Sequence, residues 1–366
     1  MRVWRWALIS AAVFTSGCLE VAAERARMDA TVGRAQNGGD SANVSEGLAS
    51  VQALEGGQLT LWANAPAFEL ALESGTGGQW VLTVENAMSD ATLIASVNGE
   101  PLATQSLDSD RPTLKRWQFS MPPSSRARLR LSTADAGQTT PFNYVVFADV
   151  QGRIDGVQDI YRRMNEEEVR FGLISGDLTE RGSNEELARF KREMRTLNFP
   201  LFATLGNHEL GTDEFNFHRH FGRGSSSFVF RGVRFTMLDS ASATLAPQVY
   251  DWLGGWLADG EGGLHMVIMH HPPLDPDGKR NGAFASRSEA NKLLSTLARG
   301  GVDLTVYGHV HSFYTFENAG IEAFISGGGG AIPQRLDGVG RHFLKILADP
   351  ASQRMTTGIV RISPAD

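Results

Sequence analysis

Five short polar motifs, each directly after an apolar run, are the feature that most constrains this chain. They are Asp149-Val150-Gln151, Gly176-Asp177, Gly206-Asn207-His208-Glu209, His270-His271-Pro272-Pro273 and Gly308-His309-Val310-His311. In α/β sheets, the loops at the carboxyl ends of strands project side chains into a common crevice. If each apolar run is a strand, all five motifs lie on one face of the domain. The pattern predicts a single polar site built from all of them.

The segments that carry these motifs alternate between strand-like and helix-like patterns, which predicts a layered α/β domain over residues 140–366. We expect strands at 144–148, 171–175, 200–205, 227–230, 233–238, 264–269 and 303–307, and helices at 154–170, 185–197, 247–258 and 286–298.

Residues 53–137 have a different pattern, in which short apolar runs alternate with turn residues and no long helix is evident. We expect strands at 59–62, 68–72, 80–84, 92–97, 116–119 and 127–131, which is typical of a small β-sandwich. Histidine is absent before His208, and the acidic residues here are scattered among turns. A binding or spacing module is the favoured interpretation.

The first eighteen residues have the outline of a signal peptide. Two positive charges in Met1–Arg5 precede an apolar run at 7–14, and small residues then lead to Cys18. The apolar run is shorter than the roughly 20 residues of a membrane-spanning helix. The segment resembles a bacterial lipoprotein signal, which implies lipidation of Cys18 and an exported, membrane-anchored protein in the periplasm or outside the cell. The alternative is a cleaved secretory signal with an incidental cysteine, since Thr15 stands where such signals usually have Leu.

Residues 19–52 are rich in Ala, Gly, Ser, Asn and charged residues and show no apolar periodicity. That composition predicts a flexible linker between the signal peptide and the first domain.

The charge and the cysteine content exclude some classes of partner and site. The chain has 34 Lys and Arg against 41 Asp and Glu, a formal charge of -7 that repels a polyanion, so we expect no nucleic-acid partner. Because Cys18 is the only cysteine, neither an intramolecular disulfide nor a thiolate-rich metal site can form. Any metal must be bound by oxygen and imidazole ligands.

Taken together, the five motifs resemble those of the calcineurin-like metallophosphoesterase superfamily, which includes purple acid phosphatases and cyclic-nucleotide phosphodiesterases. The resemblance covers about residues 143–348. It extends to the hairpin-like segment 228–239, and Gly308–Phe313 is similar to the purple acid phosphatase form of the last motif. The resemblance implies a two-sheet β-sandwich core flanked by helices, with a binuclear metal centre at the strand ends.

Carried over residue by residue, the resemblance implies hydrolysis of a phosphate mono- or diester by a metal-bound hydroxide. Asp149 and His311 would bind the first metal, and Asp177 would bridge both. The second metal would be bound by Asn207, His270 and His309. His208 would stabilise the transition state or protonate the leaving oxygen. The alternative role for His208 is to orient its neighbours.

The ligand set also makes physical sense without the family. Two cations about 3.5 to 4 Å apart need a shared anion to offset their repulsion, and a carboxylate such as Asp177 supplies it. Imidazole and carboxylate together favour two ions of Fe, Mn or Zn. Such a pair generates hydroxide near neutral pH and neutralises phosphoryl oxygens.

Two positions leave alternatives open. The family motif has His where this chain has Gln151, whose amide oxygen is a neutral and weaker ligand, so the first metal would be bound more weakly or be Mn or Fe. The resemblance makes His270 the ligand, with His271 either facing substrate or packing behind it.

Three functions are consistent with these observations. The favoured one is a phosphoesterase outside the cytoplasm. The second is a catalytically weak or inactive envelope binding protein that keeps the fold, which only Gln151 supports. The third, a nuclease, is disfavoured by the acidic charge.

Substrate contacts depend on loops 211–225 and 274–287, where Arg223, Arg280 and Arg287 are candidate phosphate ligands. We interpret Asp239 as structural and Gly327–Gly330 as a tight loop near the site.

Overall fold

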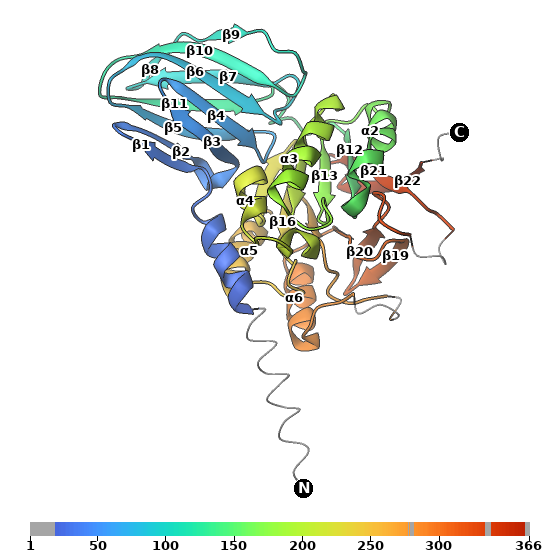
Figure 1. Cartoon of the computed structure of the whole chain (residues 1–366). Coiled ribbons are helices and arrows are strands. Elements are labelled where there is room, and N and C mark those ends of the chain that lie inside the picture. The colour runs from blue at the N-terminus through green and yellow to red at the C-terminus, as the bar shows by residue number, and fades with distance from the viewer. Residues whose placement is uncertain (1–18, 277, 279–281, 334–337, 363–366) are drawn as a thin grey trace.

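The computed structural model describes residues 19–276, 278, 282–333 and 338–362. It has mixed α/β architecture, with an all-β region followed by a layered region of sheets and helices (Figure 1), so the predicted fold class is confirmed. The predicted signal peptide, Cys18 and Arg280 lie outside the described residues.

The N-terminal region is a sandwich of two mainly antiparallel sheets. In β11 every second residue is buried, and Arg126, Arg128 and Arg130 point outward, as expected for a strand with one solvated face. The six-stranded sheet has the order β1 (Arg34–Asn37), β2 (Asp40–Val44), β5 (Phe68–Ser74), β11 (Ser125–Ser132), β7 (Thr92–Val97) and β8 (Glu100–Pro101). The five-stranded sheet has the order β3 (Ala49–Glu55), β4 (Gln58–Ala63), β6 (Gly78–Glu85), β10 (Lys115–Met121) and β9 (Gln105–Leu107).

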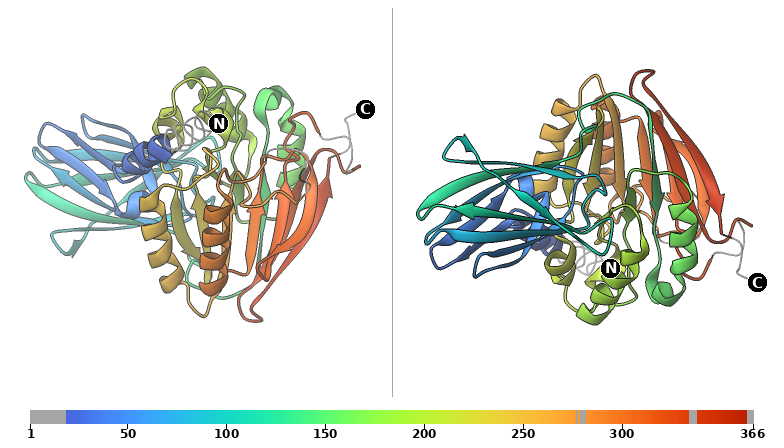
Figure 2. Two further views of the ribbon diagram at one scale, coloured as in Figure 1. Left: turned by 90° about the horizontal axis from the view of Figure 1, so that it is seen from below. Right: turned by 90° about the horizontal axis from the view of Figure 1, so that it is seen from above.

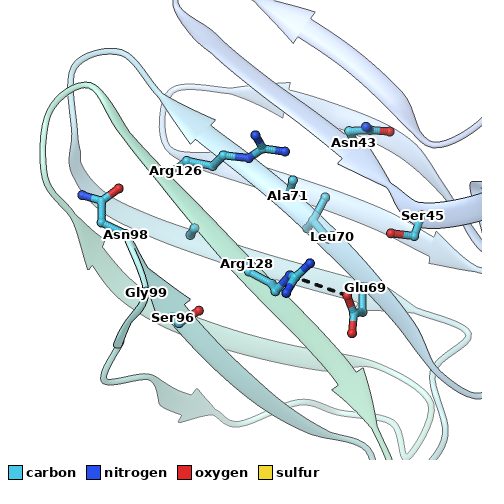
Figure 3. Close-up of a pocket in the computed structure, with 11 residues that line it drawn as sticks. Asn43, Ser45, Glu69, Leu70, Ala71, Ser96, Asn98, Gly99, Arg126 and Arg128 are labelled. Carbon is cyan, nitrogen blue, oxygen red and sulfur yellow. Dashed lines mark ion pairs between the residues drawn. The ribbon is translucent and has the colours of Figure 1, made fainter.

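The outer face of the six-stranded sheet is charged (Figure 3). A shallow groove of about 560 Å³ runs over it between the side chains of Arg126, Arg128 and Asn98. Arg128 lies 3.6 Å from Glu69, and Arg126 lies 3.8 Å from Glu73. All four side chains are largely exposed, so these pairs contribute little to stability, and the face is a solvated one.

The prediction of a flexible linker over residues 19–52 is wrong. Residues 19–29 are helical, and β1, β2, the short 3-10 turn Ser45–Gly47 and most of β3 follow, so the sandwich begins at Arg34 rather than at residue 53. Composition concealed the helix because it packs through two small residues, Ala22 and Ala26, and through buried charges rather than through large apolar residues.

The C-terminal region stacks two sheets face to face, with helices on both outer sides (Figure 2). One sheet has the order β14 (Leu201–Thr204), β13 (Gly172–Ser175), β12 (Phe142–Phe147), β21 (His342–Asp349) and β22 (Arg354–Arg361). The other has the order β15 (Ser226–Phe230), β16 (Val233–Leu238), β17 (Leu264–Met269), β18 (Leu304–Tyr307), β20 (Ile321–Ser326) and β19 (Phe313–Asn318).

Helices cover the outside of each sheet. The first sheet is covered by α2 (Gln158–Asn165), α3 (Asn184–Glu193) and α4 (Asn216–Phe221), and the second by α5 (Pro247–Asp259) and α6 (Arg287–Arg299). Short 3-10 turns at Gln151–Gly156, Met194–Thr196 and Asn207–Leu210 join these elements. The apolar cluster between the sheets is rich in Phe and continues into the core of the N-terminal sandwich.

All strands predicted from the apolar runs occur, but the sequence analysis missed α4, β1 to β3, β8, β9 and β19 to β22. The missed β19 and β22 lie at the edges of their sheets and are only partly buried, so their sequences contain no apolar run. The helix predicted at 154–170 is shorter than expected: α2 ends at Asn165, and Glu168 has a positive φ of 47°.

One buried asparagine ties the N-terminal sandwich to the sheet that carries the site. Asn86 is 6% exposed and has a φ of 58°. Its Nδ2 donates hydrogen bonds to the carbonyls of Ala63 (2.9 Å) and Leu201 (2.8 Å), and its Oδ1 accepts one from Leu201 N (3.0 Å).

We therefore predict that Asn86→Ala lowers the free energy of unfolding by about 2 to 4 kcal/mol, because it leaves buried backbone groups unpaired and places alanine in a left-handed conformation. Urea unfolding measures the change. Asn98→Ala is the matched control, since Asn98 also has a positive φ (51°) but is exposed. Equal losses in the two variants would contradict the prediction.

Candidate metal centre

The predicted site residues follow the carboxyl ends of strands from both sheets. Asp149, Asp177 and Asn207 follow β12, β13 and β14, which are parallel neighbours in the first sheet. His270 follows β17, and His309 and His311 follow β18, which pairs in parallel with β17 in the second sheet. Because the ends of both sheets meet here, the five motifs converge on one place.

Several residues of these motifs have strained backbone conformations. Asp149, Gln151, Asp177 and His309 all have positive φ angles, of 65°, 48°, 54° and 67°. This conformation costs a residue with a Cβ roughly 1 to 2 kcal/mol, and such strain persists where the surrounding structure enforces it. Because four strained residues lie together at this point, the placement of their side chains, rather than the conformational preference of the backbone, determines the local fold.

The glycines of the motifs allow the loops to approach one another. A Cβ on Gly308 would lie 2.8 Å from the carbonyl oxygen of Ser175, and one on Gly176 would lie 2.7 Å from Nδ1 of His270. Neither position has room for a larger residue, so the Gly-Asp and Gly-His pairs are needed for packing as well as for chemistry.

Two buried carboxylates form the centre of the site. Asp149, Asp177 and His270 bring ligand atoms within 4.8 Å of one another. Oδ1 of Asp177 lies 3.3 Å from Nε2 of His270, and Oδ1 of Asp149 lies 3.5 Å from Nε2 of His311. The backbone N–H of His309 donates to both carboxylate oxygens of Asp149, at 3.1 and 3.0 Å.

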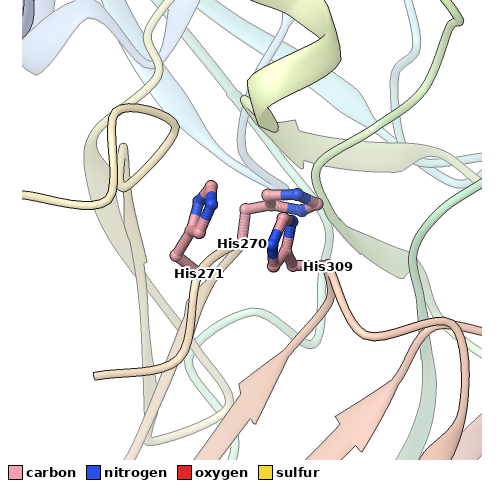
Figure 4. Close-up of side chains that lie close together, drawn as sticks. All are labelled: His270, His271 and His309. Carbon is pink, nitrogen blue, oxygen red and sulfur yellow. The ribbon is translucent and has the colours of Figure 1, made fainter. Parts of the chain in front are cut away.

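Three histidines, shown in Figure 4, form the adjoining part of the site together with Asn207. Oδ1 of Asn207 lies 3.0 Å from Nε2 of His270 and 2.9 Å from Nδ1 of His309. His270 donates from Nδ1 to the carbonyl of Ser175 (2.8 Å), which directs Nε2 toward Asp177. The ring of His271 lies alongside that of His309, with 4.0 Å between centroids.

His271 therefore belongs to the same cluster as His270, and the two have different surroundings. Ligand atoms of His270, His271 and His309 lie within 4.8 Å of one another. The side chain of His271 is buried, and its Nδ1 has no hydrogen-bond partner among the described residues. Its backbone N–H donates to Oγ of Ser240 (2.8 Å), so the strand end that carries both histidines is held by the loop after β16.

Gln151 lies inside the site. Its Nε2 donates to Oδ2 of Asp177 (2.9 Å) and lies 3.0 Å from Nε2 of His311. His311 in turn donates from Nδ1 to the carbonyl of Ile332 (2.9 Å). Turning the amide of Gln151 end for end would present its oxygen at the same place, which is the arrangement that a metal ligand requires.

His208 lies at the solvent side of the centre. Its side chain is 26% exposed, and Nδ1 donates to the carbonyl of Glu180 (2.7 Å). Nε2 is then directed inward, 3.9 Å from Oδ2 of Asp177. This position suits a group that contacts a bound substrate rather than one that only supports the ligands.

The electrostatics of the centre favour positive charge. Burial by itself raises the pKa of Asp177, but the neighbouring charge of His270 and its hydrogen bond outweigh burial and hold that pKa below its usual value. Burial lowers the pKa of His270, and the charges of Asp177 and Asp149 reverse this and raise it to about 9. The buried carboxylates thus stabilise a cation at this point.

Glu209 is a supporting residue to which the sequence analysis assigned no role. Its buried carboxylate accepts hydrogen bonds from the backbone N–H groups of Asp177 (2.9 Å), Gly206 (2.9 Å) and Thr179 (3.0 Å). Burial and the charge of Asp177 raise its pKa to about 7. The signal in the sequence was an acidic residue two positions after Asn207, inside one of the polar motifs.

Other predicted positions have structural roles. Gly329 N–H donates to the carbonyl of Ala148, and Ala331 N–H to that of Asp149, so the Gly-rich segment lies directly behind the site, as expected. Arg223 was a candidate phosphate ligand, but its guanidinium stacks on Trp252 and donates to the carbonyl of Glu46. The structure thus gives Arg223 contacts with other parts of the chain.

Residues 142–313 match the family model of the calcineurin-like phosphoesterases. These residues, a little under half of the chain, are similar to members of that family. The matched residues include all five motifs of the site.

Individual proteins that this chain resembles are distant from it. A 3',5'-cyclic-nucleotide phosphodiesterase of Nostoc sp. is 24% identical over 156 residues, which cover 39% of this chain and 56% of the relative, so the chain spans a little over half of that protein's length. Among solved structures, PhoD has a TM-score of 0.48 and 9% identity, and the match covers 82% of this chain and 90% of the PhoD chain. A dimetal phosphatase from Danio rerio has a TM-score of 0.47 and 15% identity, and the match covers 61% of this chain and 99% of that phosphatase.

We predict that Glu209→Ala lowers the free energy of unfolding by about 2 to 5 kcal/mol and reduces the bound metal, because three buried N–H groups of the ligand loops lose their acceptor. Urea unfolding and elemental analysis measure the two effects. Glu180→Ala is the control, since Glu180 also accepts a backbone hydrogen bond, from Gly152 N, but is exposed. A Glu209→Ala protein with wild-type stability and metal content would refute the assignment.

Proposed function

We propose that this protein hydrolyses a phosphate mono- or diester at a binuclear metal centre formed by the five motifs. The observation that carries the proposal is the position of Asp177. One of its carboxylate oxygens faces His270 at 3.3 Å, and the other faces Gln151 at 2.9 Å. A carboxylate between two sets of ligands is the shared anion that a pair of cations needs.

The residues fit such a pair of ions. Asp149, Gln151 and His311 would bind one ion, and Asn207, His270 and His309 the other, with Asp177 common to both. The donors are oxygen and imidazole nitrogen, which suit Fe, Mn or Zn. His270 and His311 each donate from Nδ1 to a backbone carbonyl, which fixes the tautomer that directs Nε2 into the site.

When bound, the ions would supply an activated water and positive charge for the phosphoryl oxygens. The chain's own contribution is to place the ligands and a proton donor. His208 donates from Nδ1 to Glu180 O, and its Nε2 lies 3.9 Å from Oδ2 of Asp177. A protonated Nε2 at the solvent side can hydrogen-bond a phosphoryl oxygen or donate its proton to the leaving oxygen.

Metal removal tests this proposal. Protein freed of metal should hydrolyse neither a chromogenic phosphomonoester nor the matching diester, and Mn, Zn or Fe should restore turnover. Asp177→Ala should lower the restored rate by about 100-fold or more, since even indirect partners of metal ligands cost 10- to 100-fold.

Asp213→Ala is the control for that experiment, because Asp213 is a partly exposed carboxylate that pairs with Arg219 near the same loops. If the folded, metal-loaded protein turns over neither ester, the function is instead that of a binding protein that keeps the fold. The ratio of the two rates ranks the ester classes.

We propose further that the protein is exported and anchored through a lipid on Cys18, which the charged, apolar and small-residue order of residues 1–18 supports. Among the described residues, no helix has the length and apolar character needed to cross a bilayer.

Expression in a bacterial host with labelled palmitate should label the wild type and not Cys18→Ser, and only the wild type should remain with the membrane fraction. A cleaved and released wild-type protein without label would show that the cysteine is incidental.

A further inference from the structure

The helix at residues 19–29 is attached to the phosphoesterase domain through buried charges. In Figure 1 this helix lies beside α5, and Ala22 and Ala26 pack into the apolar cluster under α5 and α6. Arg25 is 0% exposed, and Asp29 is 1% exposed. An arginine is rarely buried this completely without a specific partner, because the uncompensated charge would cost several kcal/mol.

The main partner of Arg25 is Asp239, the residue directly after β16. Nε donates to Oδ2 of Asp239 (2.7 Å), and Nη2 donates to Oδ1 (3.2 Å). Nη2 also donates to Oγ of Ser242 (3.0 Å), and Nη1 lies 3.5 Å from Oε2 of Glu214. This paired geometry fixes both the position and the orientation of the carboxylate.

Asp239 begins a loop that touches the metal centre. Its Oδ1 also accepts from the backbone N–H of Ala241 (3.0 Å), which shapes the turn after β16. Oγ of Ser240, inside that turn, accepts from the backbone N–H of His271 (2.8 Å). His271 follows the candidate ligand His270 and lies against the ring of His309. A continuous set of contacts thus leads from Arg25 to two candidate ligands of the second ion.

We propose that Arg25 is a positioning residue of the metal centre, which acts through Asp239 and Ser240 on the strand end that carries His270 and His271. The N-terminal helix therefore helps to set the geometry of the proposed phosphoesterase site. The inference rests on the proposed binuclear centre. It predicts an effect on metal binding, and an effect on turnover follows from that.

The full-length protein with Arg25→Met tests the inference, since methionine keeps much of the side-chain volume but removes the charge and all four contacts. Mn²⁺ affinity at the site of the second ion, which His270 and His309 would bind, should fall about 10- to 100-fold, as for other residues that orient metal ligands. The visible spectrum of the Co²⁺-loaded protein should change, because it reports ligand geometry. The kcat should fall more than KM rises.

Two controls separate positioning from loss of stability. Arg27→Ala, on the exposed side of the same helix, should match the wild type in every measurement. Asn86→Ala should be less stable yet keep wild-type Mn²⁺ affinity and Co²⁺ spectrum. If Arg25→Met behaves like Asn86→Ala, the inference is overturned.

Ser240→Ala covers the case in which Arg25→Met does not fold. It removes only the hydroxyl that accepts from His271 N–H, so it should weaken Mn²⁺ binding and alter the Co²⁺ spectrum with a smaller change in stability. Wild-type values in Ser240→Ala would overturn the proposed route. A wild-type protein that binds Mn²⁺ but hydrolyses no ester would refute the proposed function and leave this test intact.

Discussion

The structure depends on two carboxylates, Asp149 and Asp177, which are buried side by side where two β-sheets meet. Burying negative charge without compensation is among the most costly arrangements in a protein. Here the compensation comes from His270 and His311, from backbone N–H groups and, in the proposed function, from metal ions. Much of the surrounding architecture serves to hold these groups at fixed distances: the left-handed ligand residues, the glycines without room for a side chain, and Glu209 beneath the loops.

The supporting contacts are mainly polar and connect segments far apart in the sequence. Glu209 ties the loop after β14 to the loop after β13, and Ser240 ties the loop after β16 to His271. Asn86 ties the N-terminal sandwich to β14, whose end leads to Asn207. Hydrogen bonds of this kind specify direction as well as proximity, which apolar packing alone does not. Asn86 thus connects two parts of the fold, whereas Glu209 and Ser240 contact the loops that carry the candidate ligands.

Gln151 shows how the site can depart from the family pattern without losing its geometry. Its amide occupies a place between Asp177 and His311 where an imidazole is usual, and it hydrogen-bonds both. A neutral amide contributes less binding energy to a cation than imidazole does, while the carboxylates and the other histidines keep their positions. In the proposed binuclear centre, the difference would therefore affect which metal the first position prefers more than the architecture of the centre.

The sequence by itself predicted most of the buried strands around the site and the candidate ligands that follow them. Runs such as Leu264–Met269 are buried over their whole length, and each motif residue follows such a run, so local pattern was enough to predict both. The tertiary structure alone decided the helix at 19–29, the edge strands β19 and β22, and the roles of Glu209 and Arg25. The reason is physical: Arg25 and Asp239 are 214 positions apart, and each is an ordinary charged residue until the fold buries them together. Apolar burial leaves a periodic trace in the sequence, whereas a single buried ion pair leaves none.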